Sequence, residues 1–139
     1  MMKSGYTPRI LVADDDPIVQ QFVSSILMEN GYEVFTASDG RQALDMVREI
    51  KPDLVILDLI MPYRDGYEVL RLLQEKDETR SVPVIILSAK SREEDIIRGL
   101  EAGAEDFMIK PFNALELVAR ARKVLARTLK AGMQWTRTS

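Results

Sequence analysis

The chain has 139 residues, of which 46% are hydrophobic and 29% charged, and its net charge is −3. These values are typical of one globular domain, and the lack of a basic surplus argues against direct nucleic-acid binding by this segment. Because the sequence contains no Cys and no His, it excludes disulfides, thiolate metal sites, a phosphohistidine intermediate and catalytic triads built on His.

Five short, β-branched and apolar runs alternate with longer amphipathic stretches. The strand candidates are residues 9–14, 33–37, 53–58, 82–88 and 106–110. Several are almost entirely apolar, as strands covered on both faces must be. The alternation predicts an α/β fold in which five strands form a parallel sheet and five helices connect or follow them.

The first two helices are delimited by specific residues. The first begins at Pro17, which suits the first turn of a helix, and Asp16 before it is positioned to cap the helix. Apolar residues then recur at helical spacing until Gly31, where the helix is expected to end. The second helix begins at Asp39, and Gln42 would complete a capping box.

Three further helices are expected in the second half of the chain. The third starts at about Gly66, and sequences of the form S-x-x-E and N-x-x-E predict that the fourth opens at Ser91 and the fifth at Asn113. The apolar periodicity of the fifth fades near Arg127. We therefore expect residues 128–139 to be a helix end followed by a linker or tail.

The ends of the chain give expectations about organisation and location. No apolar run approaches the ~18 residues that span a bilayer, and residues 1–8, expected to be an N-terminal tail, lack the apolar core of a signal peptide. We expect a cytoplasmic protein that does not insert into membranes, with a single domain over residues 9–127.

Polar residues stand at the carboxyl ends of four predicted strands. Asp14 and Asp15 follow the first, Asp58 the third, Ser88 the fourth and Lys110 the fifth. Ligands bind beyond these ends in doubly wound sheets, so we expect the residues to converge. Three carboxylates brought together repel one another unless a cation is present, and Mg²⁺ prefers such oxygen ligands. The pattern therefore predicts a magnesium site.

Four stretches, ILVADDD, PDLVILDLIMPYRDGYEVL, VPVIILSA and GLEAGAEDFMIKPF, resemble the receiver domain of two-component response regulators in their order and spacing. The resemblance covers residues 9–127. It implies a flavodoxin-like, doubly wound sheet with strand order 2-1-3-4-5. It also implies phosphorelay signal transduction, in which a sensor histidine kinase or a phosphotransfer protein donates a phosphoryl group to this domain.

The resemblance assigns the acceptor and the metal ligands. Asp58 would be the nucleophile that forms an aspartyl phosphate. Asp15 would bind Mg²⁺ directly, Asp14 mainly through water, and the acceptor Asp58 itself and the backbone carbonyl of Ile60 would complete the protein ligands. Such a protein would catalyse its own phosphorylation and dephosphorylation, and is not expected to turn over a separate substrate.

The resemblance also implies a switch. Lys110 would neutralise the phosphoryl oxygens, and Ser88 would form a hydrogen bond with one of them after transfer. Phe107 would move inward when Ser88 moves. This movement would alter a partner surface made of the fourth helix, the fifth strand and the fifth helix, through which a homodimer could form.

Two other classes of protein share part of this pattern. A phosphatase of the haloacid dehalogenase class also uses an aspartyl phosphate, but its nucleophile lies after the first strand in a D-x-D pattern, which would leave Asp58 unexplained. A flavodoxin-like nucleotide-binding module needs backbone amides around phosphate in the first loop, where this chain has DDDP. The sequence leaves open whether the chain acts alone or is part of a longer protein, and which kinase and output it serves.

Overall fold

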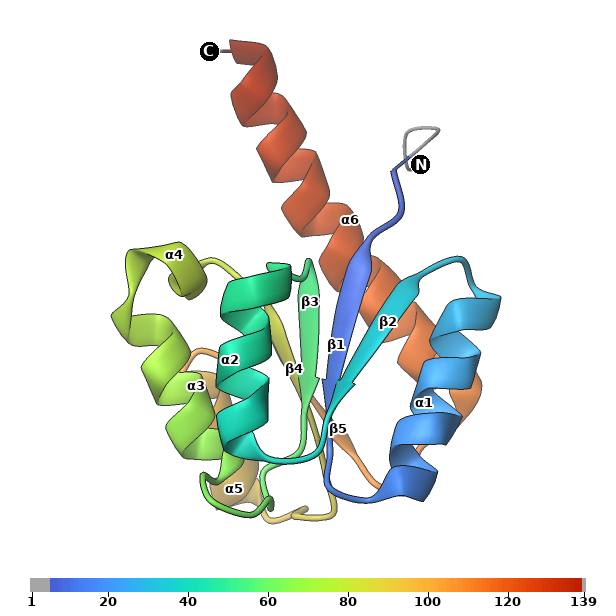
Figure 1. Cartoon of the computed structure of the whole chain (residues 1–139), viewed down its shortest axis with the longest axis vertical. Coiled ribbons are helices and arrows are strands. Elements are labelled where there is room, and N and C mark those ends of the chain that lie inside the picture. The colour runs from blue at the N-terminus through green and yellow to red at the C-terminus, as the bar shows by residue number, and fades with distance from the viewer. Residues whose placement is uncertain (1–5, 139) are drawn as a thin grey trace.

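The computed structural model describes the backbone of residues 6–138 and the side chains of residues 6–129. Within this part of the chain, five parallel strands form one sheet in the order β2-β1-β3-β4-β5, which confirms the predicted topology (Figure 1). The strands are β1 (Arg9–Ala13), β2 (Glu33–Ala37), β3 (Leu54–Leu57), β4 (Val84–Ser88) and β5 (Asp106–Ile109).

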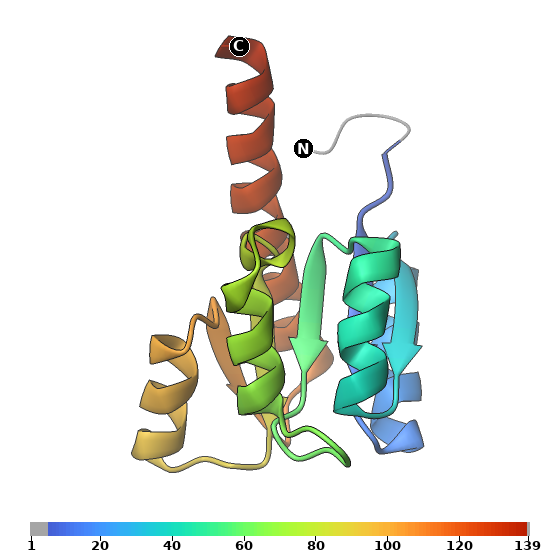
Figure 2. The ribbon, with the colours of Figure 1, turned by 60° about the vertical axis from the view of Figure 1, so that its left-hand side comes forward.

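Six helices occur within residues 6–138, one more than the sequence predicts. They are α1 (Pro17–Glu29), α2 (Gly40–Ile50), α3 (Gly66–Glu75), α4 (Asp77–Arg80), α5 (Glu93–Glu101) and α6 (Ala114–Thr138). Helices α1 and α6 cover one face of the sheet, and α2, α3 and α5 cover the other (Figures 1 and 2). No helix in the described part of the chain is long and apolar enough to cross a membrane.

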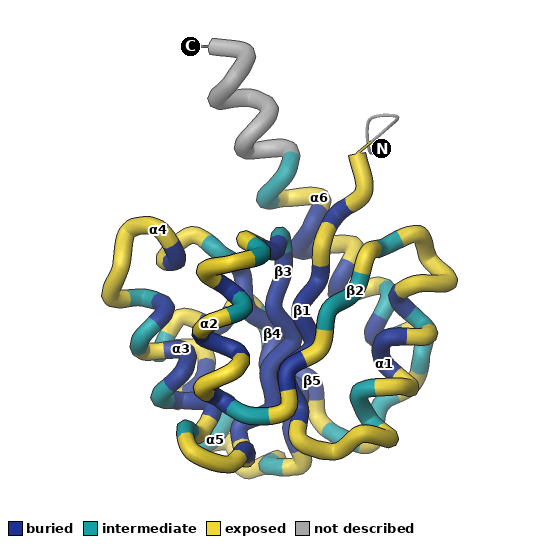
Figure 3. The backbone as a smooth tube through the Cα atoms, viewed as in Figure 1, coloured by how far each residue is buried: buried dark blue, intermediate teal, exposed yellow. Residues whose placement is uncertain are grey.

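The core consists of two apolar layers, one on each face of the sheet. Alternate residues of a strand point to opposite faces, so Ile10 and Val12 of β1 pack with Val23 and Leu27 of α1. On the other face, Leu11 belongs to the layer that α2 and α3 cover. Figure 3 shows the resulting band of buried backbone along the central strands. This two-sided burial explains why the strand sequences are apolar without alternation.

Two of the predicted helix starts are confirmed in detail. The Asp16 carboxylate accepts a hydrogen bond from the Ile18 N–H at 2.9 Å, and Asp39 accepts one from the Gln42 N–H at 2.8 Å. The Gln42 side chain, however, accepts from Ser38 instead of Asp39, so the capping box is not reciprocal. These caps fix the first residues of α1 and α2 beside the carboxyl ends of the strands.

The prediction for the start of α5 is wrong. The helix begins at Glu93 after Arg92, and no side chain caps it, so Ser91 is not the capping residue. Three acidic residues fill the first turn, and negative side chains interact favourably with the amino end of a helix. They can stabilise this end without a capping hydrogen bond.

Two other differences concern helix lengths. Helix α4 is a single turn whose Thr79 hydroxyl donates a hydrogen bond to the Leu73 carbonyl at 2.7 Å, and four polar residues give no periodicity from which to predict it. Helix α6 does not end near Arg127 but continues to Thr138, beyond the sheet (Figures 1 and 2). Extending an existing helix by further residues costs much less free energy than starting a new one. No proline interrupts this segment, so the helix can continue through it.

The expected N-terminal tail lies only partly within the described residues. The Tyr6 hydroxyl donates a hydrogen bond to the Asp53 carboxylate at 2.6 Å, and the Arg9 N–H donates to the same carboxylate at 2.8 Å. Burial, together with this carboxylate, raises the pKa of Tyr6 to about 12. These contacts attach the beginning of the domain to the amino end of β3, opposite the site.

Candidate functional site

The structure brings two aspartates together at the carboxyl ends of the central strands. Asp14 follows β1 and Asp58 follows β3, and their residues are 2% and 7% exposed. Backbone hydrogen bonds extend the sheet to both positions, since the Asp14 N–H donates to the Ala37 carbonyl at 3.0 Å and the Asp58 N–H to the Ala13 carbonyl at 2.9 Å. The two carboxylates are therefore held by the sheet itself.

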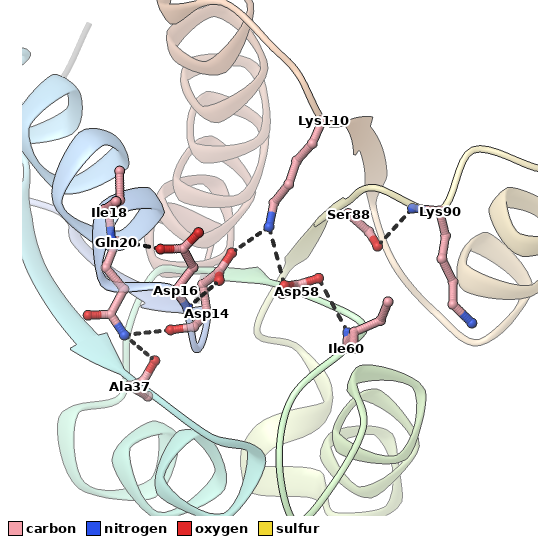
Figure 4. A network of polar contacts seen from close by, with 10 residues as sticks. All are labelled: Asp14, Asp16, Ile18, Gln20, Ala37, Asp58, Ile60, Ser88, Lys90 and Lys110. Carbon is pink, nitrogen blue, oxygen red and sulfur yellow. Dashed lines mark hydrogen bonds and ion pairs between the residues drawn. The ribbon is translucent and has the colours of Figure 1, made fainter.

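Lys110 reaches both carboxylates from the end of β5 (Figure 4). Its ammonium lies 2.9 Å from Asp14 Oδ2 and 3.2 Å from Asp58 Oδ2. The peptide bond between Lys110 and Pro111 is cis. The predicted convergence of these three residues is confirmed.

The titration of the site follows from burial and from charge. Burial raises the pKa of Asp58, and the neighbouring Asp14 carboxylate raises it further, although the Lys110 ammonium acts in the opposite direction. Burial alone would lower the pKa of Lys110, but the hydrogen bonds and charges of Asp14 and Asp58 outweigh it and leave the pKa raised. The lysine is therefore charged at neutral pH and offsets part of the repulsion between the carboxylates.

A third carboxylate completes an acidic cluster. The side chains of Asp14, Asp15 and Asp58 can each place one oxygen so that these oxygens lie within 4.8 Å of one another. Asp15 is exposed, so one side of the cluster is open to solvent. Such a set of oxygen ligands with an open side suits a hard divalent cation that keeps several waters, and the residues present therefore fit Mg²⁺.

The loop after β1 is held by a side chain that no sequence pattern distinguishes. Gln20 of α1 uses its amide N–H groups to contact the Asp14 carbonyl, the Ala37 carbonyl and the Ser38 hydroxyl. The Asp14 carboxylate also accepts a hydrogen bond from the Asp16 N–H at 2.9 Å. A glutamine at a polar helix position has no distinctive pattern, so only the structure identifies this support.

The remaining predicted residues surround the acceptor. The Ile60 N–H donates to Asp58 Oδ1 at 3.3 Å, and Ile60 is 57% exposed. Ser88, at the end of β4, is fully buried, and its hydroxyl accepts a hydrogen bond from the Lys90 N–H at 3.2 Å. Phe107 of β5 is 8% exposed and lies beside Ile86 of β4, two residues before Ser88.

The face formed by α5, β5 and α6 carries charges that pair within one chain. Arg120 lies 2.7 Å from Asp106 and 3.1 Å from Glu116, and Arg127 lies 2.7 Å from Glu105. All of these side chains are partly exposed. Five charged residues of this face therefore already have ion-pair partners within the single chain: Glu105, Asp106, Glu116, Arg120 and Arg127.

Comparison with known proteins agrees with this geometry. Residues 10–122 match the family model described as the response regulator receiver domain. The chain belongs to the response regulator receiver family. It is accordingly a receiver domain of two-component signalling, and the fold described above is that of a receiver.

Individual relatives cover most of this receiver domain. It is 44% identical over 119 residues to the DNA-binding response regulator MtrA of Mycolicibacterium smegmatis, covering 86% of this chain and 51% of that protein. It is 40% identical over 119 residues to the phosphate regulon transcriptional regulatory protein PhoB of Klebsiella pneumoniae, covering 86% and 52%. The receiver domain thus spans about half the length of these curated relatives.

Among solved structures, the receiver domain of Francisella response regulator 1452 is 38% identical and superposes with a TM-score of 0.83. The match covers 88% of this chain and 99% of that one. The receiver fold therefore extends over nearly all of the described strands and helices.

Proposed function

We propose that Asp58 accepts a phosphoryl group from a sensor histidine kinase or a phosphotransfer protein. One observation carries this proposal: the buried Asp58 carboxylate lies 3.2 Å from the Lys110 ammonium, within an acidic cluster that has an open side. Because this chain contains no His, a phosphohistidine donor must lie outside these 139 residues. Transfer from small phosphodonors is expected as well.

The proposed reaction is an in-line displacement at phosphorus. An oxygen of Asp58 forms the new bond to phosphorus while the bond between phosphorus and the donor atom breaks, and the electron pair of that bond leaves with the donor. Lys110 balances the negative charge of the phosphoryl oxygens, and Asp14 keeps the ammonium between the two carboxylates. Phosphoryl transfer depends mainly on positioning and charge neutralisation, which these residues provide.

Magnesium would be held by the Asp14, Asp15 and Asp58 carboxylates, together with the Ile60 backbone carbonyl. When bound, it supplies the positive charge that lets an anionic phosphodonor approach three carboxylates. The support for this assignment is the separation of at most 4.8 Å among the carboxylate oxygens.

The phosphoryl group would act through Ser88 and Phe107. A hydrogen bond from the Ser88 hydroxyl to a phosphoryl oxygen would move the end of β4, and Phe107 would follow it inward. The support for this switch is that Ser88 is fully buried and that its hydroxyl makes one hydrogen bond within residues 6–129, which it accepts from the Lys90 N–H. A new bond to the phosphoryl group can therefore redirect it.

The proposed output surface consists of α5, β5 and α6. Movement of Phe107 would change this face, which could bind a second copy of the chain through opposite charges repeated across a two-fold axis. Because Arg120 and Arg127 pair within the chain, dimerisation would exchange existing ion pairs for equivalent ones. We therefore propose that the dimer is weak before phosphorylation.

Labelling with a small phosphodonor tests the proposed function. Acetyl phosphate with Mg²⁺ should add one acid-labile phosphoryl group to the wild-type chain, as measured by intact-mass spectrometry. The Asp58→Asn variant should gain none, and a chelator should prevent labelling of the wild type. Equal labelling of the variant and the wild type would refute the assignment.

A further inference from the structure

Tyr67 connects three parts of the receiver that lie far apart in sequence. It is the second residue of α3 and is only 7% exposed. Its hydroxyl donates a hydrogen bond to the Asp95 carbonyl of α5 at 3.0 Å. On its ring, the Arg98 guanidinium lies 3.8 Å and the Lys90 ammonium 5.9 Å from the centroid. The start of α3 is thereby joined to α5 and to the loop after Ser88.

The backbone before Tyr67 packs tightly against the acceptor. The Gly66 N–H donates a hydrogen bond to the Leu59 carbonyl at 2.8 Å. A Cβ atom added at Gly66 would lie 2.5 Å from the Asp58 carbonyl oxygen and 2.6 Å from Leu59 Cα, so only glycine fits there. A shift of the backbone at Asp58 must therefore displace the start of α3, which carries Tyr67.

Helix α5 has few other contacts with the core, which include the partly buried Ile96. All of its residues are described, and among them only Gly99 is buried, while no side chain caps its amino end. Gly99 packs against Ile86 and Phe107, since an added Cβ would lie 2.7 Å from Ile86 Cδ1 and 3.2 Å from the Phe107 ring. Two aromatic residues thus contact α5: Phe107 at Gly99, and Tyr67 at Asp95 and Arg98.

We infer that Tyr67 is a positioning residue that links the acceptor loop to α5, as a second connection beside the proposed switch of Ser88 and Phe107. The inference rests on the proposed phosphorylation of Asp58 and adds a residue to its regulation. The Tyr67 hydroxyl and ring hold α5 in the unphosphorylated position. A change at Asp58 reaches α5 through Gly66 and Tyr67 as well as through β4 and β5.

Amide hydrogen exchange measures how firmly α5 is held. Tyr67→Phe removes one hydroxyl hydrogen bond, and exchange in residues 93–101 should become about fivefold faster, as expected for one neutral hydrogen bond. Tyr67→Leu also removes the ring beside Arg98 and should have a larger effect. Tyr32→Phe is the matched control, because the Tyr32 hydroxyl has no hydrogen bond among the described residues; exchange in α5 should not change.

Exchange with and without beryllofluoride and Mg²⁺ distinguishes a link from a simple support. In the wild type the phosphoryl mimic should alter exchange in both α5 and β5. In Tyr67→Leu the change in α5 should fall by at least half, while the change in β5 persists. Tyr67→Phe, which keeps the ring, should retain most of the response.

Two results would overturn the inference. The first is that α5 exchanges at the wild-type rate in both Tyr67→Phe and Tyr67→Leu without beryllofluoride. The second is that α5 of Tyr67→Leu responds to beryllofluoride as fully as the wild type does. A wild-type chain that did not respond to beryllofluoride anywhere would instead contradict the proposed phosphoacceptor function. In that case, faster α5 exchange in the unliganded variants would still establish that Tyr67 holds α5.

Discussion

The Lys110 ammonium lies 3.2 Å from the Asp58 carboxylate, although 52 residues separate them in the chain. Strand β4 lies between the strands that carry them, and the Lys110 N–H donates a hydrogen bond to the Ser88 carbonyl at its end. The sheet therefore brings a cation to the buried acceptor. The charge of Asp58 is balanced only in part, however, because Asp14 shares the same ammonium.

The Asp58→Asn variant should be more stable than the wild type at pH 7, by about 1 kcal/mol. Because burial and Asp14 raise the pKa of Asp58, the ionised carboxylate destabilises the folded state. This penalty is complete above the raised pKa and disappears as the pH falls below the ordinary value of 3.8. The stability advantage of Asp58→Asn over the wild type should therefore disappear in acid. Urea unfolding at pH 7 and pH 3.5 measures it.

Asp45→Asn serves as the control for that experiment, since Asp45 is exposed on α2. Its effect should stay within ~0.5 kcal/mol at both pH values. A loss of stability in Asp58→Asn at pH 7 would show that the ion pair with Lys110 outweighs burial and repulsion.

Lys110→Met should destabilise the fold by about 2 kcal/mol at pH 7, because it leaves two buried carboxylates without their shared cation. The lysine side chain is 21% exposed, which keeps the loss below that for a fully buried pair. The loss should shrink as the pH falls and the Asp58 carboxylate, whose pKa is raised, takes up a proton. In the wild type, the raised pKa of Lys110 means that its contribution is present at neutral pH and disappears only as the pH rises through that pKa.

Thermal unfolding of Lys110→Met at pH 7 and pH 5 measures this dependence. Lys123→Met, which changes an exposed lysine of α6, should show little loss at either pH. If Lys110→Met lost as much stability at pH 5 as at pH 7, packing of the lysine stem and not its charge would be the cause.

Magnesium should raise the Tm of the wild type in a concentration-dependent way, because a ligand that binds only the folded state stabilises it. Asp15→Asn should remove most of this increase while leaving the metal-free Tm nearly unchanged, since Asp15 is exposed and belongs to the cluster. Asp16→Asn is the matched control, because Asn also caps a helix and Asp16 lies outside the cluster. An equal Mg²⁺ effect in Asp15→Asn and the wild type would remove Asp15 from the proposed ligands.

Beryllofluoride should increase the dimer fraction at low salt, as measured by sedimentation, and added salt should reverse the increase. Arg120→Gln should weaken the dimer because Arg120 carries two of the ion pairs on the α5, β5 and α6 face. Arg48→Gln on α2 should leave it unchanged. A chain that stays monomeric at high micromolar concentration in both states would refute the dimer and leave this face for another partner.

The predictable part of the structure follows from local patterns. The apolar strand sequences suffice to predict the sheet, and the capping residues Asp16 and Asp39 suffice to predict where two helices start. The convergence of Asp14, Asp58 and Lys110 also follows, because parallel strands end at one edge. Such features depend on residues that are close in sequence or on a general rule of topology.

The features that were not predicted depend on tertiary contacts. In the sequence, Tyr67 is indistinguishable from an ordinary apolar residue of α3. Its role depends on the contact with α5, which the sequence does not show. The pairing of Arg120 with Asp106 within one chain likewise requires the relative positions of β5 and α6. Helix α5 starts without the expected cap at Ser91, because charged residues of the first turn can replace a capping side chain.

The position of the phosphoryl group tests the central claim most directly. After labelling with acetyl phosphate and Mg²⁺, borohydride reduction converts an aspartyl phosphate to homoserine, which peptide mass spectrometry can locate. The account predicts homoserine at position 58 alone. Homoserine at position 14 or 15, or equal amounts in samples prepared with and without phosphodonor, would contradict it.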